Sequence, residues 1–165
     1  HVMITYNEQG GYPHPDHIRC HEISAMAYDL AADPNAYPEA GEPWEIKKLY
    51  YEEIFNRERV LSIEKWLLEN DPESELLARF EEMREWLTRR PYTGTARVNV
   101  GGFLETRDEA LLAHASQVPP TATFFFWPND VQRQAWPFED YRLAKSRIET
   151  AEFEHDLFEG IEDSE

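Results

Sequence analysis

One short stretch near the N-terminus of this 165-residue chain gathers several reactive side chains. Two glycines and two prolines there are interleaved with three polar residues in close succession, His14, Asp16 and His17. A neutral imidazole can bind a divalent metal ion, and a neighbouring carboxylate can fix the tautomer of a second imidazole. His14 and Asp16 beside a metal-bound His17 would therefore form half of a hydrolytic site.

The prolines of this stretch predict an ordered loop that leads into a helix. Pro13 and Pro15 fix their own φ angles at about −65° and push the residues before them towards extended conformations. Asp16 is a favourable N-cap, and the helical pattern begins directly after it, so we expect His17 in the first turn. The same pattern also fits a capped helix start whose histidines have no chemical role.

Cys20 and His21 follow His17 within the predicted helix. His21 lies four residues after His17 on the same helical face, a spacing that suits two zinc ligands. The order is not His-Glu-x-x-His, however, because Glu22 follows His21, so we expect His21 to pack beside the site. Cys20 is the only cysteine, which excludes an internal disulfide and favours a reducing cytoplasm.

The charge of the chain argues against two classes of partner. It has 16 basic and 33 acidic residues, which give a net charge of −17 at pH 7. Such a surface repels phosphate backbones and anionic membranes, so we expect binding to neither nucleic acid nor membrane. The length suits one domain with a hydrophobic core, and residues 1–165 are predicted to form a single domain.

The periodicity of the N-terminal third predicts strands that alternate with a helix. Residues 1–6 contain a continuous apolar run typical of a central strand in a parallel sheet. The loop of residues 7–16 then lies at the carboxyl end of that strand, where open α/β sheets bind ligands. The next predicted elements are a helix at 17–32 with Ile23, Ala27 and Leu30 on one face, a loop at 35–44 and a strand at 46–51.

The remainder of the chain predicts a helical hairpin and a mixture of short elements. The hairpin covers residues 57–89, breaks at Asp71-Pro72 and carries an apolar stripe that packs in the core or in a cap, formed by Leu76, Phe80, Met83 and Leu87. After it we expect a strand at 95–100, a helix at 104–115, a buried apolar run at 124–127, a short helix at 130–136, a strand or helix at 141–148 and a loosely held acidic tail.

The stretch Tyr-Asn-Glu-Gln-Gly-Gly-Tyr-Pro-His-Pro-Asp-His, residues 6–17, resembles a signature of the zinc-dependent deacetylase superfamily. This superfamily includes the N-acetylglucosaminyl-inositol deacetylases. The likeness covers nearly the whole chain and keeps its order. Four further stretches are most similar to the mycothiol S-conjugate amidases within the superfamily: residues 37–44, 48–51, 107–117 and 156–161.

The resemblance implies a fold and a set of site residues. The fold would be α/β, a Rossmann-like three-layer domain with a mostly parallel sheet and a helical cap, of which residues 57–89 form an insert. At the end of its predicted helix, His114 also fits a purely structural role through the helix dipole. The implied site consists of Zn²⁺ with His17 as a ligand, His14, Asp16 and Tyr12 as catalytic residues, and Tyr12, His114 and Gln117 as substrate-binding residues.

One element of the family pattern does not occur in this sequence. A first signature, Ala-His-Pro-Asp-Asp-Glu, supplies two further zinc ligands and the general base in the family. We therefore expect a chain that lacks the N-terminal strands of the family fold and is inactive by itself. The missing N-terminal half would then be its partner.

The resemblance also implies a reaction. It is the zinc-dependent hydrolysis of the amide bond of a small-molecule mycothiol S-conjugate, which releases a mercapturic acid and glucosaminyl-inositol during cytoplasmic detoxification. Three alternatives stay open. The chain could belong to a deacetylase of N-acetylglucosaminyl-inositol, it could be a non-catalytic binding module, or it could pair with a separately encoded N-terminal half.

Overall fold

The computed structural model describes the chain except for residues 79, 81–82, 84–90, 120–126 and 163–165. The chain divides into two compact units. Unit 1 comprises His1–Ile54, Thr93–Val98 and Asp140–Glu165, and unit 2 comprises Phe55–Tyr92 and Asn99–Glu139. The single domain and the insert expected from the sequence stay predictions.

Unit 1 is built on a four-stranded sheet with the order β1-β2-β4-β3. Strands β1 (Val2–Thr5) and β2 (Lys48–Glu52) are parallel, and helix α1 (Pro15–Leu30) lies between them in the chain. Strand β4 (Phe138–Ser146) runs antiparallel to β2, and β3 (Ala96–Asn99) forms the far edge.

The predicted α/β class is confirmed, but the predicted mostly parallel sheet is not supported. Strand β4 runs against β2, so the sheet is mixed. Strand β1 lies at one edge of the described sheet rather than at its centre, and Ile4 is 49% exposed. An apolar run indicates a strand but does not record whether its neighbours are parallel or antiparallel, and this is why the prediction failed.

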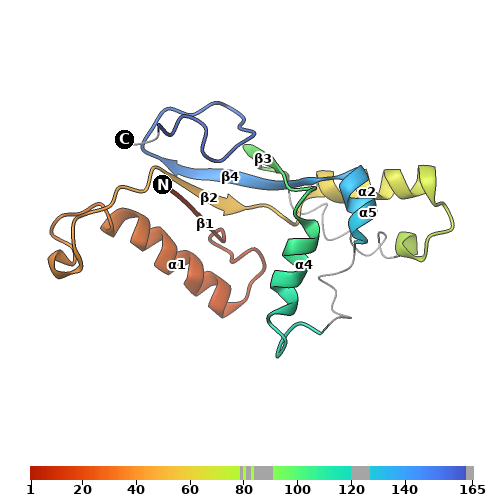
Figure 1. Ribbon diagram of the computed structural model, residues 1–165, viewed down its shortest axis with the longest axis horizontal. Coiled ribbons are helices and arrows are strands. Elements are labelled where there is room, and N and C mark those ends of the chain that lie inside the picture. Colours follow the sequence, from red (N-terminus) through yellow and green to blue (C-terminus); the bar gives the residue numbers. More distant parts are fainter. Residues whose placement is uncertain (79, 81–82, 84–90, 120–126, 163–165) are drawn as a thin grey trace. The chain divides into compact units, whose positions relative to one another are not determined.

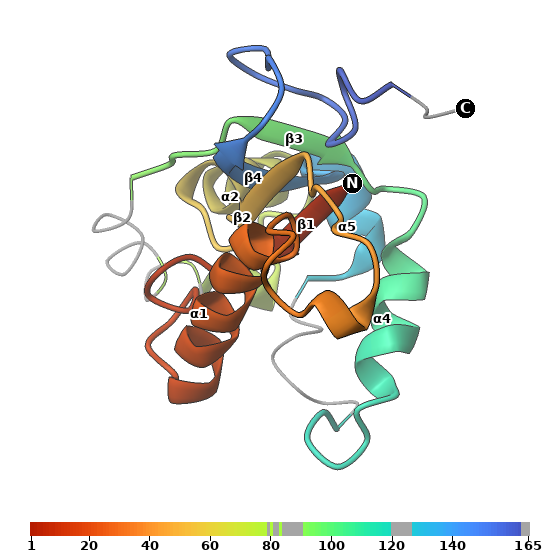
Figure 2. The same cartoon turned by 90° about the vertical axis from the view of Figure 1, so that its left-hand side faces the viewer.

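The sheet of unit 1 is covered on both faces. Alternate side chains of a strand point to opposite faces, and those of β2 follow this rule. Leu49 and Tyr51 pack with Tyr28 of α1, whereas Tyr50 packs with Leu157 of the C-terminal segment. Figure 1 shows α1 on one side of the sheet and this segment, in blue, on the other, and Figure 2 shows the same layers from one end.

The segment after β4 is packed against the sheet, which corrects the prediction of a loosely held acidic tail. Glu154 is only 1% exposed, and its backbone forms hydrogen bonds to Thr95 and Arg97, each 2.9 Å long. Its carboxylate lies 2.5 Å from Nζ of Lys48 and accepts a hydrogen bond from the hydroxyl of Tyr50. The acidic composition was misleading because a lysine of β2 compensates this buried charge.

Helix α1 begins two residues earlier than predicted. Pro15 occupies the first helical position, where proline is favoured because its missing N–H has no partner there in any case. The apolar face of the predicted helix is only partly buried, because Ile23 is 54% exposed. Tyr28 anchors the helix to the sheet instead and is 2% exposed. A short 3-10 helix, η1 (Pro38–Ala40), lies in the loop that follows.

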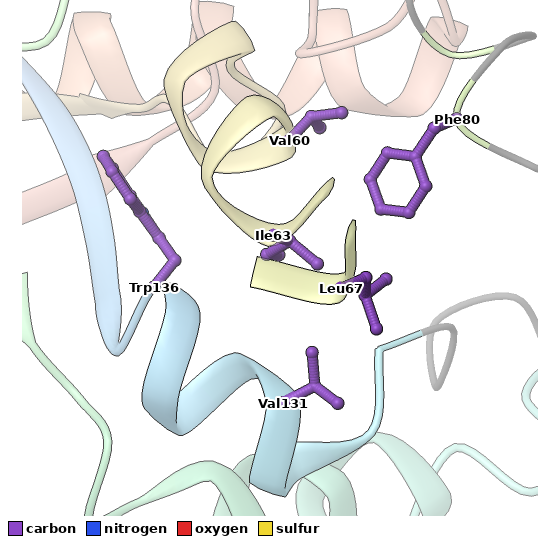
Figure 3. Close-up of a cluster of buried hydrophobic side chains, with 6 residues drawn as sticks. All are labelled: Val60, Ile63, Leu67, Phe80, Val131 and Trp136. Atoms are coloured by element: carbon purple, nitrogen blue, oxygen red, sulfur yellow. The ribbon is translucent and has the colours of Figure 1, made fainter. Parts of the chain in front are cut away.

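Unit 2 is helical in its described part. Helix α2 (Arg57–Asn70) is capped by Asn56, whose side-chain oxygen accepts a hydrogen bond of 2.9 Å from the backbone N–H of Arg59. Unit 2 also contains helices α4 (Leu104–Leu112) and α5 (Asn129–Ala135) and the 3-10 helix η2 (Glu75–Leu77). Figure 3 shows the core between α2 and α5, which consists of Val60, Ile63, Leu67, Phe80, Val131 and Trp136.

The first helix of the predicted hairpin is confirmed as α2, with the predicted bounds. Most of the second helix lies outside the described residues, as does Leu87 of its stripe. Phe80 of the same stripe is fully buried in the core of unit 2. The apolar run at 124–127 also lies outside the described residues except for Trp127, whose ring centre is 5.2 Å from that of Phe80.

The other predicted elements are confirmed with small shifts. The strand at 95–100 corresponds to β3, and the helices at 104–115 and 130–136 correspond to α4 and α5. The element at 141–148 is a strand, β4. In the described part of the chain, none of the helices is both long and apolar enough to cross a membrane.

Candidate active site

The loop between β1 and α1 is closed by hydrogen bonds to Asn7. Its side-chain oxygen accepts from the backbone N–H groups of Gln9 at 3.0 Å and Gly11 at 3.1 Å. Gly10 and Gly11 have φ angles of 74° and 72°, in the left-handed region that favours glycine. A Cβ atom on Gly10 would lie 2.7 Å from Cβ of His17, so glycine is what lets the loop close onto α1.

The imidazole of His17 is held on three sides. Its Nδ1 lies 3.0 Å from the carbonyl oxygen of Gly10. Because a carbonyl oxygen can only accept, Nδ1 donates, and Nε2 of the neutral ring keeps its lone pair. Tyr6 stacks on the ring with centroids 4.2 Å apart and planes inclined by 11°, and Tyr12 meets it edge-on at 4.6 Å. His17 therefore has the tautomer that metal binding through Nε2 requires.

The N-cap of α1 is His14, which corrects the prediction that Asp16 has this role. Nδ1 of His14 accepts a hydrogen bond of 3.2 Å from the backbone N–H of Asp16, the second residue of the helix. Since Nδ1 accepts, neutral His14 carries its proton on Nε2 and can donate it in a hydrogen bond. The link from Asp16 to His14 thus runs through the backbone, and the role proposed for the Asp16 carboxylate stays a prediction.

Three of the predicted site residues lie close together. The ring centre of His14 is 5.3 Å from that of His17 and 6.1 Å from that of Tyr12. Tyr12 is 45% exposed, so its side chain is accessible to a ligand. The structure thus brings together the imidazole of His17, the hydrogen-bond donor of His14 and the phenol of Tyr12 where the loop joins α1, while their chemical roles stay predictions.

Sequence reasoning missed Tyr6 and Glu52, which contact this loop, whereas His21 packs beside the site as expected. Tyr6 stacks on His17, and Nδ1 of His21 lies 3.0 Å from the carbonyl oxygen of Tyr6. Glu52, at the end of β2, approaches so closely that a Cβ on Gly11 would lie 2.6 Å from its carboxylate. Burial raises the pKa of Tyr6, and the charge of Glu52 adds to this effect. The four-residue spacing of the two histidines was the one signal in the sequence.

The described residues do not include three His, Cys, Asp or Glu side chains placed to hold one metal ion. A catalytic zinc site usually has three protein ligands. His17 fits one of them, because zinc-bound histidines usually donate their other ring N–H to a carbonyl or carboxylate oxygen. The described part of the chain therefore offers one prepared ligand and not a complete metal centre.

His114 and Gln117 lie in unit 2, just after α4. Nδ1 of His114 lies 3.0 Å from the carbonyl oxygen of Ala110, in the last turn of the helix. The backbone N–H of Gln117 donates to the carbonyl oxygen of His114 at 2.8 Å. The other site residues belong to unit 1, so the joint substrate pocket implied by the resemblance stays a prediction.

Comparison with known proteins reveals several relatives. The chain is 43% identical to a mycothiol S-conjugate amidase from Streptomyces coelicolor over 99% of this chain and 56% of that protein. The family resemblance is therefore confirmed. Identity is 34% to a 1D-myo-inositol 2-acetamido-2-deoxy-alpha-D-glucopyranoside deacetylase from Frankia alni over 97% of this chain and 56% of that protein. It is 31% to the deacetylase of the same name from Streptomyces scabiei, over 97% of this chain and 50% of that protein.

The matches cover only part of each relative. The chain spans about half the length of the curated relatives it matches, at 50% to 56% of the three proteins named. No protein-family model matches the chain.

Proposed function

We propose that this chain is part of a zinc-dependent amidase that hydrolyses the amide bond of mycothiol S-conjugates. The products would be a mercapturic acid and glucosaminyl-inositol. The observation that carries the hydrolase proposal is the arrangement of His17, whose Nδ1 is bound to the Gly10 carbonyl while Nε2 keeps its lone pair beside His14. The 43% identity to an amidase over 99% of the chain supports the substrate class.

The proposal gives His17 a role in zinc binding. His17 would be one ligand of the zinc ion through Nε2. Bound zinc supplies a water of lowered pKa and polarises the amide carbonyl. The other two ligands and the general base would come from the part of the relatives that this chain does not match.

The tautomer of His14 favours one of two roles for this residue. Its Nδ1 accepts from the backbone of Asp16, so the neutral ring offers an N–H at Nε2. Such a donor stabilises the oxyanion that forms on the amide carbonyl. A general acid would need a second proton on Nδ1, and that proton would break the N-cap hydrogen bond. We therefore assign His14 to the oxyanion, with the Tyr12 hydroxyl as a further donor or substrate contact.

A hybrid protein tests the proposal directly. In it, this chain replaces the matched part of the Streptomyces coelicolor amidase, and hydrolysis of a mycothiol S-conjugate is followed by mass spectrometry. We expect stoichiometric zinc and turnover in the hybrid, and loss of both in His17→Asn. Asparagine keeps an N–H for the Gly10 carbonyl but has no atom equivalent to Nε2. The exposed His155 provides a control, because His155→Ala should change neither property. Full zinc content in His17→Asn would contradict the proposal.

A deacetylase of N-acetylglucosaminyl-inositol is the second candidate, because the 34% identity to such an enzyme also covers 97% of the chain. The two reactions share the zinc chemistry and differ in the acyl group that is released. Parallel assays of the hybrid with both substrates therefore separate them. A higher kcat/KM for the acetylated glucosaminyl-inositol would favour the deacetylase. A folded, zinc-loaded hybrid that binds either compound without hydrolysis would favour the non-catalytic binding module.

The remaining partner and location assignments also belong to this proposal. The partner would be a small molecule, together with a segment equivalent to the unmatched part of the relatives, in the same chain or encoded separately. The exposed thiol of Cys20 is unpaired with any other cysteine and fits the reducing cytoplasm expected from the sequence.

A further inference from the structure

Two histidines of α1 hold the two ends of the site loop in the same way. His17 binds the carbonyl oxygen of Gly10 through Nδ1, and His21 binds that of Tyr6 through Nδ1, both at 3.0 Å. The two residues lie four positions apart, so their side chains lie one above the other on one face of the helix. Residues 6–10 are thereby attached to successive turns of α1.

The bond to His21 fixes a residue that contacts the proposed zinc ligand. Tyr6 lies at the point where β1 passes into the loop, and its ring stacks on the imidazole of His17 at 4.2 Å. The ring of His21 is itself held edge-on against Tyr51 of β2, with centroids 5.2 Å apart. A chain of contacts therefore runs from β2 through His21 and the backbone of Tyr6 to the face of His17.

We propose that His21 and Tyr6 are positioning residues that hold the His17 imidazole for metal binding. This inference rests on the proposed function, since it takes His17 as a zinc ligand. His21 acts through the N–H at Nδ1, which keeps Tyr6 at its place, and Tyr6 acts through the flat face of its ring. The imidazole, held by Gly10, Tyr6 and Tyr12, can then present Nε2 without losing rotational freedom on binding.

A competing role for His21 is that of a zinc ligand through its own Nε2. Two substitutions distinguish the roles. Nδ2 of asparagine occupies the place of Nδ1 in histidine, so His21→Asn keeps the donor to Tyr6 and removes Nε2. His21→Ala removes both. If His21 positions Tyr6, asparagine restores what alanine loses, whereas if His21 binds zinc, asparagine and alanine are equally harmful.

The test uses NMR on the chain labelled with ¹⁵N at its histidines. Long-range ¹H–¹⁵N spectra are recorded at a pH above about 6.5, the ordinary pKa of imidazole, and should show the Nδ1–H tautomer for both His17 and His21. In His21→Ala and Tyr6→Leu, the ring-current shift of the His17 protons should decrease. In His21→Asn and Tyr6→Phe it should persist, because the donor and the aromatic ring remain.

Titration with Zn²⁺ alone provides the second readout, followed at the His17 resonances. We expect His21→Ala and Tyr6→Leu to weaken zinc binding by about tenfold or more, the usual effect of losing an outer partner of a ligand. His21→Asn, Tyr6→Phe and the control His155→Ala should stay within about twofold of the parent chain, well below that effect.

The outcomes separate the inference from the function on which it rests. If the His17 resonances of the parent do not respond to Zn²⁺, or if competition with a chelator shows that His17→Asn binds Zn²⁺ as tightly as the parent, the proposed function fails. If His17 responds but His21→Ala and Tyr6→Leu bind zinc like the parent, the positioning role is wrong. If His21→Asn is as weak as His21→Ala, His21 is a ligand and the inference is overturned.

Discussion

Nδ1 of His14 accepts a hydrogen bond from the backbone N–H of Asp16, 3.2 Å away, so this side chain caps α1 at the same time as it lies beside His17. The two functions can be separated, because asparagine is a preferred N-cap but lacks an imidazole. We expect His14→Ala to lower the free energy of unfolding by about 1 kcal/mol. His14→Asn should leave it nearly unchanged, as measured by urea denaturation.

We expect the two substitutions of His14 to have the same effect on catalysis. In the hybrid enzyme, both His14→Ala and His14→Asn should lower kcat by about 100-fold, the usual scale for losing an oxyanion donor. Zinc content should be retained in both. Full turnover in His14→Asn would show that the imidazole has no chemical role. Loss of zinc in step with activity would mean that the roles of His14 and His17 are exchanged.

Gly10 should tolerate no side chain. Its φ of 74° strains any other residue, and a Cβ would lie 2.7 Å from Cβ of His17. Gly10→Ala is therefore expected to lower the free energy of unfolding by about 1–3 kcal/mol and to disturb the NMR signals of His17. Gly102→Ala is the control, since a Cβ at Gly102 would meet nothing within 4 Å. Equal effects of the two substitutions would refute the close packing of loop and helix.

The buried ion pair of Lys48 and Glu154 should attach the C-terminal segment to the sheet. Both side chains are at most 1% exposed. Lys48→Met leaves a buried carboxylate without its counter-charge and should cost about 3–5 kcal/mol of unfolding free energy. Adding Glu154→Gln should recover a large part of this loss, because no charge then remains. Thermal unfolding of the two variants checks this, and a double variant as unstable as Lys48→Met alone would contradict it.

Alkaline pH should destabilise unit 1 through Tyr50. Burial raises the pKa of this fully buried phenol far above its ordinary value of 10.0, and its hydrogen bond to Glu154 adds to the effect. The folded state therefore holds the proton more tightly than the unfolded chain. The contribution of Tyr50 to the free energy of unfolding is complete below pH 10.0 and is lost above it, at up to about 1.4 kcal/mol per pH unit. Tyr50→Phe should flatten this alkaline slope in urea denaturation, and an unchanged slope would refute the assignment.

The helices were more predictable than the sheet because their signals are local. Helix α2 has the predicted bounds, since Asn56 caps its start and Asp71-Pro72 breaks the chain after it. The direction of β4 depends on which strand it pairs with across more than 90 residues of chain, as Tyr50 and Leu143 do, and no local pattern records that choice. The packed position of Glu154 could not be predicted for the same reason.

The grouping of the site residues was predictable, but the hydrogen bonds and ring contacts among them were not. The prolines and glycines indicated that His14, Asp16 and His17 would lie close together, and the rings of His14 and His17 do so, with the ring of Tyr12 beside them. The cap was assigned to Asp16 because aspartate is a common N-cap, although Pro15 at a favoured first position pointed to His14 instead. The stack of Tyr6 on His17 depends on how the loop returns to the helix.

The chain by itself should be a poor zinc protein and an inactive enzyme. A catalytic zinc usually needs three protein ligands, and the described residues provide one prepared imidazole and no cluster of three. We expect weak binding of Zn²⁺ and no measurable hydrolysis of a mycothiol S-conjugate, whereas the hybrid should hydrolyse it. The assay uses the purified chain with added zinc. Turnover of roughly 1 per second or faster, a typical enzyme rate, would mean that the chain holds a complete site and that the ligand assignment is wrong.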